Sequence, residues 1–485
     1  MRQNGPPAPR NRKAPTKPQH QGSVNVYQGM PKCSSPRGED ANKVPMMRPL
    51  VLVRKPREGQ ADWNKASSWL GGLPKLGGAS WPRNPATGVP LHFLAQVDLG
   101  HVSSMRRKSG LPRHGSLAFF ADTDFSQPLE DWAAAVVYVD QHMRAVDTDA
   151  PADVPPIYGQ DWSAFCKGAR NATAAPRTFP RWAADILDPK RVSIHSETLK
   201  FILRILRLDT ARSEADPYLA TKEFIKSRFQ PTGYSLSASS VAEYLPRGKE
   251  PYLWHSARAL SESIYRAIEE APLSCGHVEK SLSWSVNNLR ELESSAAAAE
   301  KLKLAQERIE GLATKLANMK SAVPELARLA EETAVWATPH NPWAPISDED
   351  FEQIKRIQEH LRTKFKDLAQ FRAILYSYEL ANLTLQEMAC GGQDVYSFLP
   401  ENVREYIRDH HLAPGNGGWH QMLGIGIEVQ SAVWENATNV LLLQLYSDDL
   451  MNWMWGDVGA LQFWIPPAAV KARDWSKVHI TLEGH

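Results

Sequence analysis

The chain has 485 residues, 42% of them hydrophobic, which is typical of a soluble globular protein with two or three packed units. Its formal charge of +2 divides into +10 for residues 1–57, which hold 12 Lys/Arg and 2 Asp/Glu, and −8 for the rest. No apolar run reaches the roughly 18 residues of a membrane-spanning helix, no secretory signal is recognisable, and no Cys-x-x-Cys pair is present. These features give no sign of a membrane span, and the cysteine spacing suggests neither a zinc site nor a disulfide framework, so we expect a cytoplasmic protein.

Residues 1–47 form a basic tail rich in Pro, Gly, Gln and Asn, with almost no apolar side chains. Such a composition buries too little surface to offset the entropy lost on ordering, so we expect disorder. Association of this tail with nucleic acid through phosphate charges is one hypothesis for function. It is not the favoured one, because no aromatic residues are interleaved with the charges and no nucleic-acid fold is attached.

Residues 48–150 are predicted to be rich in β-strands. A short strand is predicted at 51–53, and turns rich in Gly and Pro follow it. Residues 90–99 alternate with the period of two that is expected of a half-buried strand, and Gln96 points away from their apolar face. Together with further short strands, this segment predicts a meander joined by tight turns.

Residues 151–400 are predicted to be mainly helical. The longest helical segment runs from Gly276 to about Lys320, and apolar residues with heptad spacing in it must face another helix. Because a proline inside a helix removes a hydrogen bond, Pro324 predicts a kink or a helix–turn–helix at 321–324. The stripe is short, so an intramolecular, coiled-coil-like hairpin is favoured over an intermolecular dimer, and a monomer is expected.

Residues 401–485 return to β character. Two apolar stretches, 441–446 and 461–465, flank an acidic connection that is rich in tryptophan. Two β-rich regions therefore flank a helical one, and each has too few strands to be comfortably stable alone.

Short motifs in the two β-rich regions occur in a recognisable order. The first region contains Gly71-Gly72-x-Pro74, Trp81-Pro82, Pro90-Leu91-x-Phe93-Leu94-x-Gln96 and Leu111-Pro112-x-x-Gly115. The second contains His420-Gln421-x-Leu423-Gly424, Gln430, Leu441-Leu442-x-Gln444 and Trp455-Gly456-Asp457-x-Gly459-x-Leu461-x-Phe463-Trp464-Ile465. This ordered set resembles the YwqG-like family, a bacterial family of unknown function. The resemblance covers roughly 48–145 and 415–482, which is under half of the chain.

The resemblance implies an α+β fold in which two sequence-distant segments form one curved, largely antiparallel sheet. It also implies that the helical region between them is an insertion, much longer than the connection expected for the family. A second departure is Gly424-Ile425-Gly426, where a tyrosine and a proline are expected after the first glycine. The family provides no reaction, so candidate sites are judged on their own residues.

The candidate ligand- or partner-binding residues are polar groups within apolar strands or their turns, together with one tryptophan. They are Gln96, His420, Gln430, Gln444, Trp455 and Asp457. Large aromatic residues beside a few polar groups suit a ligand cleft or a protein-recognition surface. The alternative is structural, with the tryptophans filling a small core and the amides bonding buried backbone groups.

No complete catalytic set is recognisable, so no catalytic, metal-binding or cofactor-binding residue is assigned. Cys390 precedes two glycines typical of a helix C-terminus, where the helix dipole disfavours a thiolate nucleophile. A metal-assisted hydrolase that uses His420 and Asp457 is the alternative hypothesis, although the histidines lack a helical metal-site spacing. The leading hypothesis is a noncatalytic cytoplasmic protein that binds another protein or a small ligand without a cofactor.

Overall fold

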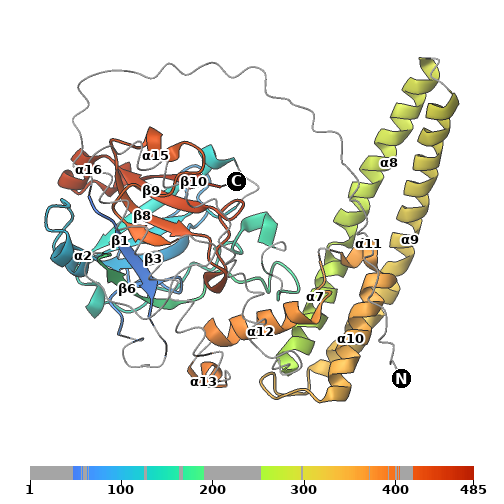
Figure 1. Ribbon diagram of the computed structural model, residues 1–485, viewed down its shortest axis with the longest axis horizontal. Helices are drawn as coiled ribbons and strands as arrows, with labels where there is room; N and C mark the ends of the chain where they lie inside the picture. Colours follow the sequence, from blue (N-terminus) through green and yellow to red (C-terminus); the bar gives the residue numbers. More distant parts are fainter. Residues whose placement is uncertain are drawn as a thin grey trace, which may run out of the picture. The chain divides into compact units, whose positions relative to one another are not determined.

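The structure is a computed structural model that describes residues 47–55, 57, 63, 65–124, 128–162, 166, 168–189, 253–295, 299–370, 372–390, 393–398, 401, 404 and 419–484 (Figure 1). The predicted basic tail, residues 1–47, lies outside the described residues apart from Met47. Among the helices of the described part, none is both long enough and apolar enough to cross a membrane.

The strands of the described residues form one antiparallel sheet in the order β10-β9-β8-β7-β1-β6-β2-β3-β4-β5. Their bounds are β1 (Leu50–Arg54), β2 (Trp69–Leu70), β3 (His92–Asp98), β4 (Ser116–Ala121), β5 (Ala134–Val139), β6 (Trp182–Leu187), β7 (His420–Met422), β8 (Val440–Tyr446), β9 (Ala460–Ile465) and β10 (His479–Glu483). The sheet curves until its edge strands, β5 and β10, contact each other. The predicted α+β fold, with a curved antiparallel sheet from two distant segments and helices between them, is confirmed.

One strand lies where helix was predicted. Strand β6 falls within residues 151–400, yet it pairs with β1 on one side and β2 on the other, at the centre of the sheet. Its six residues, WAADIL, are too few to show a clear period and include two alanines, which favour helix in isolation. Pairing on both sides outweighs that local preference, because it satisfies the strand's backbone groups.

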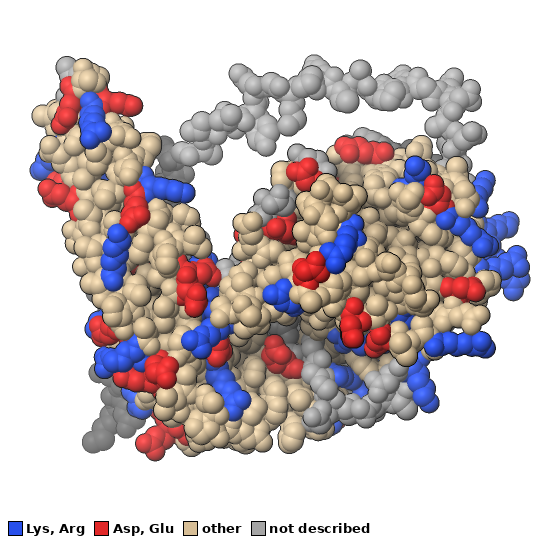
Figure 2. Space-filling model, turned by 180° about the vertical axis from the view of Figure 1, so that it is seen from behind, with Lys and Arg blue, Asp and Glu red and all other residues tan. Residues whose placement is uncertain are grey.

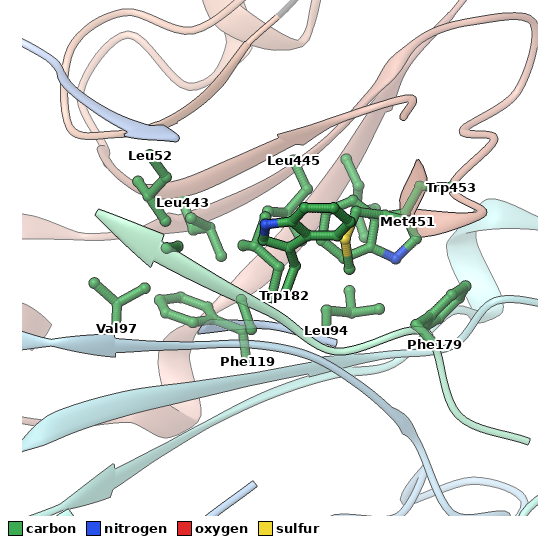
Figure 3. Close-up of a cluster of buried hydrophobic side chains, with 14 of the residues drawn as sticks. Leu52, Leu94, Val97, Phe119, Phe179, Trp182, Leu443, Leu445, Met451 and Trp453 are labelled. Carbon is green, nitrogen blue, oxygen red and sulfur yellow. The ribbon is translucent and has the colours of Figure 1, made fainter. Parts of the chain in front are cut away.

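The main hydrophobic core lies on the concave side of the curved sheet. Figure 3 shows Leu94, Phe119, Trp182 and Leu443 pointing toward one another from different strands. The rings of Phe119 on β4 and Phe463 on β9 meet edge to face with their centroids 5.2 Å apart, so strands far apart in the sheet order face each other across the core. Apolar residues from both ends of the chain therefore share one buried volume.

The sheet consists of two units with the same backbone plan, β1–β5 and β6–β10, a repeat that no sequence pattern predicted. The clearest shared feature is a pair of residues with positive φ after a short strand. Gly71 and Gly72 follow β2 with φ of 57° and 70°, and Leu423 and Gly424 follow β7 with φ of 60° and 79°. A leucine with positive φ is strained. The second unit therefore keeps the backbone conformation of the first even though the residue type differs.

A buried glutamine holds the loop after this turn in both units. Gln96 on β3 lies opposite Trp69, and its Oε1 accepts the Lys75 backbone N–H at 2.8 Å. Gln444 on β8 lies opposite β7, and its Oε1 accepts the Ile427 N–H at 2.7 Å. Lys75 and Ile427 each lie four residues after the first positive-φ residue, so the two hydrogen bonds are equivalent.

The first strands of the two units are exchanged. Strand β1 precedes β2 in sequence but pairs with β7 of the second unit, whereas β6 pairs with β2 of the first unit. β1 and β6 also pair with each other, with Val53 opposite Asp185 at the middle of their register. This pair lies at the approximate two-fold axis that relates the units, so each unit is completed by a strand of the other.

Helices occupy most of the described residues from 253 to 398. Their bounds are α7 (Trp254–Glu269), α8 (Ala271–Ser294), α9 (Ala299–Ala337), α10 (Asp348–Thr363), α11 (Lys366–Ala369), α12 (Ser377–Cys390) and α13 (Gln393–Tyr396). Shorter helices are α2 (Leu99–Met105), α15 (Ala432–Glu435) and α16 (Pro467–Ala472), and η4 (Asp449–Met451) is a single 3₁₀ turn. Ser347 caps the start of α10, since its Oγ accepts the Asp350 N–H at 3.1 Å.

Helices α8 and α9 lie side by side along their length and form a hairpin (Figure 1). Helix α8 ends at Ser294 and α9 begins at Ala299, and the helix–turn–helix predicted at 321–324 is wrong because α9 continues through Pro324. Met319, Leu326 and Ala330, on either side of the proline, are at most 3% exposed. Burial of this face outweighs the roughly 3 kcal/mol that a proline costs inside a helix.

Candidate functional site

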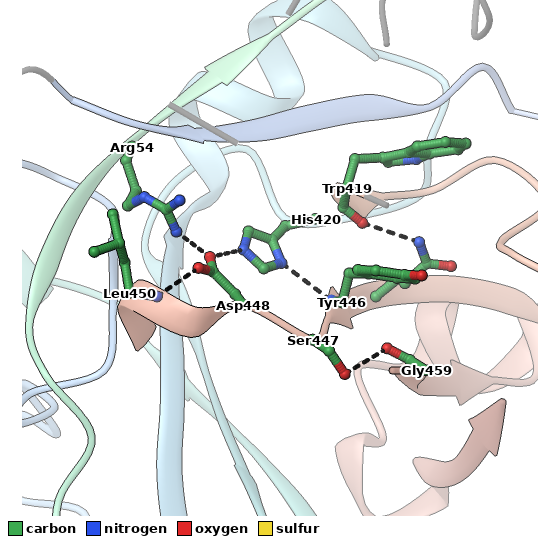
Figure 4. A network of polar contacts seen from close by, with 9 residues as sticks. Arg54, Trp419, His420, Tyr446, Ser447, Asp448, Leu450 and Gly459 are labelled. Atoms are coloured by element: carbon green, nitrogen blue, oxygen red, sulfur yellow. Dashed lines mark hydrogen bonds and ion pairs between the residues drawn. The ribbon is translucent and has the colours of Figure 1, made fainter. Parts of the chain in front are cut away.

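Three buried ionisable side chains of the sheet, Arg54, His420 and Asp448, lie together and are at most 3% exposed (Figure 4). Arg54 ends β1, His420 begins β7, and Asp448 follows β8, so three separate segments meet here. The Arg54 guanidinium forms an ion pair with Asp448 Oδ2, and the same oxygen lies 3.0 Å from His420 Nε2. We take this trio as the candidate site because buried charges normally persist only when paired.

The loop after β8 fixes the carboxylate of Asp448. Its Oδ1 accepts the N–H of Leu450 at 3.1 Å, which is a turn formed by an aspartate with its own backbone. The Asp448 N–H donates to the carbonyl of Trp453 at 2.8 Å, which closes the short acidic connection around η4. The two oxygens therefore have separate tasks, one in the turn and one in the ion pair.

The hydrogen bonds of His420 determine its protonation. Its Nδ1 accepts the backbone N–H of Tyr446 at 3.1 Å, and because a backbone N–H can only donate, this nitrogen carries no proton. Nε2 therefore holds the proton and donates it to Asp448 Oδ2. Burial lowers the pKa of His420, although the hydrogen bond to Asp448 opposes that effect. The ring is neutral, and both of its nitrogens are engaged.

The acid of the trio remains ionised. Burial alone would raise the pKa of Asp448, but the charge of Arg54 and the hydrogen bond from His420 outweigh burial and lower this pKa to about 2. A general base needs a nitrogen or oxygen within reach of a substrate proton, and the basic nitrogen of His420 already bonds the backbone. The trio is thus a structural ion-pair network, in which the basic nitrogen of His420 has no lone pair free to accept a substrate proton.

The predicted glutamines are fully buried and bond the backbone. Gln96 Nε2 donates to the Lys75 carbonyl at 3.0 Å and to Ser116 Oγ at 2.7 Å, in addition to its bond from the Lys75 N–H. Gln444 Nε2 donates to the Trp419 carbonyl at 3.0 Å. Gln444 is brought together with His420, on the neighbouring strand, whereas Gln96 belongs to the other unit.

The remaining predicted residues lie apart from the trio's hydrogen bonds. Gln430 is exposed and donates from Nε2 to the Gly484 carbonyl at 2.8 Å. Asp457 is exposed in the turn between β8 and β9, and Trp455 is fully buried in the core. The described residues contain no group of three or more His, Cys, Asp and Glu side chains that could hold a metal ion. The hydrolase that would use His420 and Asp457 stays a hypothesis without support from the geometry.

Sequence reasoning missed Arg54 and did not select Asp448. The available signal was a charged residue at the end of the apolar run LVLVR, which predicts a buried partner if the strand is central. The partner lies 394 residues away in the chain. No local pattern can specify such a pairing, so this part of the site required the structure.

Comparison with known families identifies the chain. The model of a family described as a domain of unknown function, DUF1963, matches residues 68–238 and 283–483. The chain belongs to the DUF1963 family. No curated protein matches the chain.

The DUF1963 match extends beyond the segments that carry the sequence resemblance, 48–145 and 415–482, into the helical region. His420 and Asp448 lie inside the second matched range, whereas Arg54 lies before the first matched residue, Ser68. The matched ranges thus include two of the three residues of the trio, and the description of the family assigns no activity.

Proposed function

We propose that this DUF1963 protein is a noncatalytic cytoplasmic binding protein of the YwqG-like type, and that its partner contacts the α8–α9 hairpin. One observation carries the proposal: three of the large apolar side chains that are exposed on that hairpin lie on the same flank. Leu273 and Trp284 on α8 are 62% and 58% exposed, and Leu304 on α9 is 60% exposed. In contrast, the buried trio of the sheet offers no reactive group.

The spacing of these residues places them together. Leu273 and Trp284 are eleven residues apart, which is three helical turns, so they share one face of α8. The guanidinium of Arg308 lies over the Trp284 ring at 5.3 Å, which places this part of α9 on the same flank. Leu304 precedes Arg308 by one turn and therefore lies beside it. We call Leu273, Trp284 and Leu304 the apolar flank.

The hairpin near its turn lacks the cover that its other end has. Near the start of α8, helix α7 packs on α9, and Leu260, Ile264 and Leu326 are fully buried. Toward the turn, the seam residues of α9, such as Leu302 and Ile309, are only partly buried. Figure 2 shows broad uncharged surface along these helices between scattered charges. A third helix here would bury what the hairpin leaves exposed.

Charges beside the apolar flank indicate the chemistry of the partner. Lys280 and Arg308 border Trp284, and Glu291 and Glu300 lie nearer the turn, with all four exposed. An amphipathic partner helix fits this surface if its acidic residues face Lys280 and Arg308 and its basic residues face the two glutamates. We propose such a helix, on a different protein, as the partner.

The test compares two substitutions on the same turn of α8. Trp284→Asp places a charge in the apolar flank, and Ser283→Asp places the same charge on an exposed neighbouring position outside it. Partners of the full-length protein are quantified by affinity purification from cells, and the leading one is purified and titrated. We expect Trp284→Asp to raise its Kd at least tenfold and Ser283→Asp to change it little, as for an interface hot spot.

Two results would overturn the proposal. One is a purified partner that binds both variants as tightly as the unchanged protein, and the other is substrate turnover that persists in Trp284→Asp. The same charge order also suits a second copy of the chain in antiparallel orientation, so the molar mass is measured by light scattering. If the protein forms a dimer that Trp284→Asp dissociates, the partner is a second copy of the chain and not a different protein.

Nucleic-acid association of the tail stays a prediction, since residues 1–46 lie outside the described residues.

A further inference from the structure

Two buried carboxyl groups meet where the chain between β7 and β8 crosses the end of β10. Glu428 is 6% exposed and Glu483 is 1% exposed. Burying two acidic side chains together is costly unless each has partners that stabilise its charge. Their partners therefore reveal how the pair is tolerated.

Glu483 is fully engaged as a clamp on this connection. Its Oε2 accepts the backbone N–H groups of Val429 and Gln430, at 2.5 and 2.6 Å, and its Oε1 accepts the N–H of Ala432 at 2.9 Å. Three donors from one short segment thus converge on a single carboxylate. We call residues 427–432 the latch segment, because these bonds hold it to the last strand of the sheet.

Glu428 lacks such support. Its Oε2 is buried and has no hydrogen-bond partner, although it belongs to the latch segment itself. Within the described part of the chain, the charged groups that act on Glu428 are Glu483 from β10 and Glu435 from α15, and both are acidic. An ionised Glu428 would therefore be destabilised both by burial and by two like charges.

The first unit of the sheet shows that the fold does not need these carboxyls. Leu76 follows Lys75 as Glu428 follows Ile427, and Val139 lies opposite Ser116 as Glu483 lies opposite Ala460. Leu76 and Val139 are both buried. The equivalent positions are therefore apolar in one unit and acidic in the other.

We propose that the latch segment is a pH-sensitive element, closed on β10 when Glu428 is protonated and loosened when Glu428 ionises beside Glu483. Burial, followed by the charges of Glu483 and Glu435, raises the pKa of Glu428 to about 7. A group with a raised folded-state pKa contributes stability that is complete below its unfolded pKa and is lost as the pH rises. The relevant window runs from about 4.5, the ordinary value for glutamate, to about 7.

Hydrogen exchange of the full-length protein, followed by mass spectrometry, tests this proposal. Protection factors, corrected for the intrinsic pH dependence of exchange, are compared at pH 5.5 and 7.0 for a peptide that contains the latch segment. We expect protection to fall more than tenfold, since opening increases up to about tenfold per pH unit inside the window. The matched control is the equivalent peptide around Lys75, which has Leu76 in the place of Glu428 and whose protection should therefore not fall as the pH rises.

Two variants make the outcome decisive. Glu428→Gln keeps the shape of the protonated acid, and we expect it to remove the pH dependence while retaining high protection. Glu435→Gln removes one exposed like charge and should move the transition to lower pH, which serves if the first variant folds poorly. Equal pH dependence of the two peptides, or dependence that persists in Glu428→Gln, would overturn the proposal. Neither result involves the hairpin, so the partner proposal is tested separately.

Discussion

Ser68 in the first unit of the sheet and His420 in the second perform the same task with different chemistry. Ser68 Oγ accepts the N–H of Asp98 at 2.9 Å, and His420 Nδ1 accepts the N–H of Tyr446 at 3.1 Å. Asp98 and Tyr446 each lie two residues after the buried glutamine of their strand. The bond to the backbone is thus part of the common plan, whereas the histidine ring is an addition of the second unit.

The same comparison isolates the rest of the trio. The first-unit equivalent of Asp448 is Gly100, four residues after the buried glutamine, and the equivalent of Arg54 on the exchanged strand is Ile186. One unit therefore folds without any of the three ionisable groups. The three groups are therefore specific to the second unit, and the comparison teaches that this position of the sheet tolerates either charged or uncharged residues, provided that the charges placed there are paired with each other.

The largest expected effect comes from breaking the ion pair of the second unit. Asp448→Asn keeps the size of the side chain but leaves the Arg54 guanidinium buried without a countercharge. We expect a loss of about 3–5 kcal/mol in the free energy of unfolding, measured by urea denaturation. The control Arg54→Met/Asp448→Asn removes both charges and should recover part of that loss, because the first unit already folds with an uncharged residue there. A double variant no more stable than the single one would contradict this account.

The buried glutamines test whether the two units are equivalent in energy as well as in plan. Gln96 bonds both the N–H and the carbonyl of Lys75, whereas in the second unit Gln444 accepts the Ile427 N–H and Gln462 donates to its carbonyl at 2.7 Å. Gln96→Leu should therefore cost about 2–3 kcal/mol, more than Gln444→Leu or Gln462→Leu alone.

Denaturation of the three variants and of Gln444→Leu/Gln462→Leu supplies the comparison. The double variant is expected to approach the cost of Gln96→Leu, since both then leave one loop residue with two unpaired backbone groups. If Gln96→Leu has the same free energy of unfolding as the unchanged protein, the buried glutamines do not stabilise the fold. Their predicted ligand-binding role would then be the better explanation.

The sequence was sufficient for the sheet but not for its internal repeat. Alternation around Gln96 and the ordered family motifs predicted two β-rich segments in one antiparallel sheet, because both signals are local. The repeat was missed because its shared features are backbone conformations: Leu423 occupies the place of Gly71, and the exchanged strand β6 is short and alanine-rich. Residue types give only a weak indication of such a shared backbone conformation.

The candidate site divides in the same way. Gln444 and His420 were selected because a polar residue in an apolar strand is unusual, and the structure places them on adjacent strands. Arg54 was missed because its partner is distant in the chain, and the pairing exists only after the first strands are exchanged between the units. The helix–turn–helix predicted at Pro324 was wrong because the prediction used local propensity alone. Burial against other helices keeps α9 continuous through the proline.

The smallest expected effect is a difference between the two units in how their stability depends on pH. His92 of the first unit is 3% exposed, with Nε2 3.1 Å from the Pro155 carbonyl and Nδ1 3.0 Å from Thr123 Oγ1. Burial lowers the pKa of His92 to about 4. Between that value and about 6.5, the unfolded chain binds the proton and the folded chain does not, so stability falls as the pH is lowered.

From pH 7 to pH 5 this histidine alone should remove about 2 kcal/mol from the free energy of unfolding. Urea denaturation at both pH values, for the unchanged protein and for His92→Gln, isolates the contribution as the difference between their pH dependences. The sign is opposite to that expected for Glu428, which loses stability as the pH rises. Acidification should therefore weaken the first unit through His92 while it tightens the latch segment of the second. Equal slopes in the two proteins would show that His92 binds its proton equally well in the folded and unfolded states.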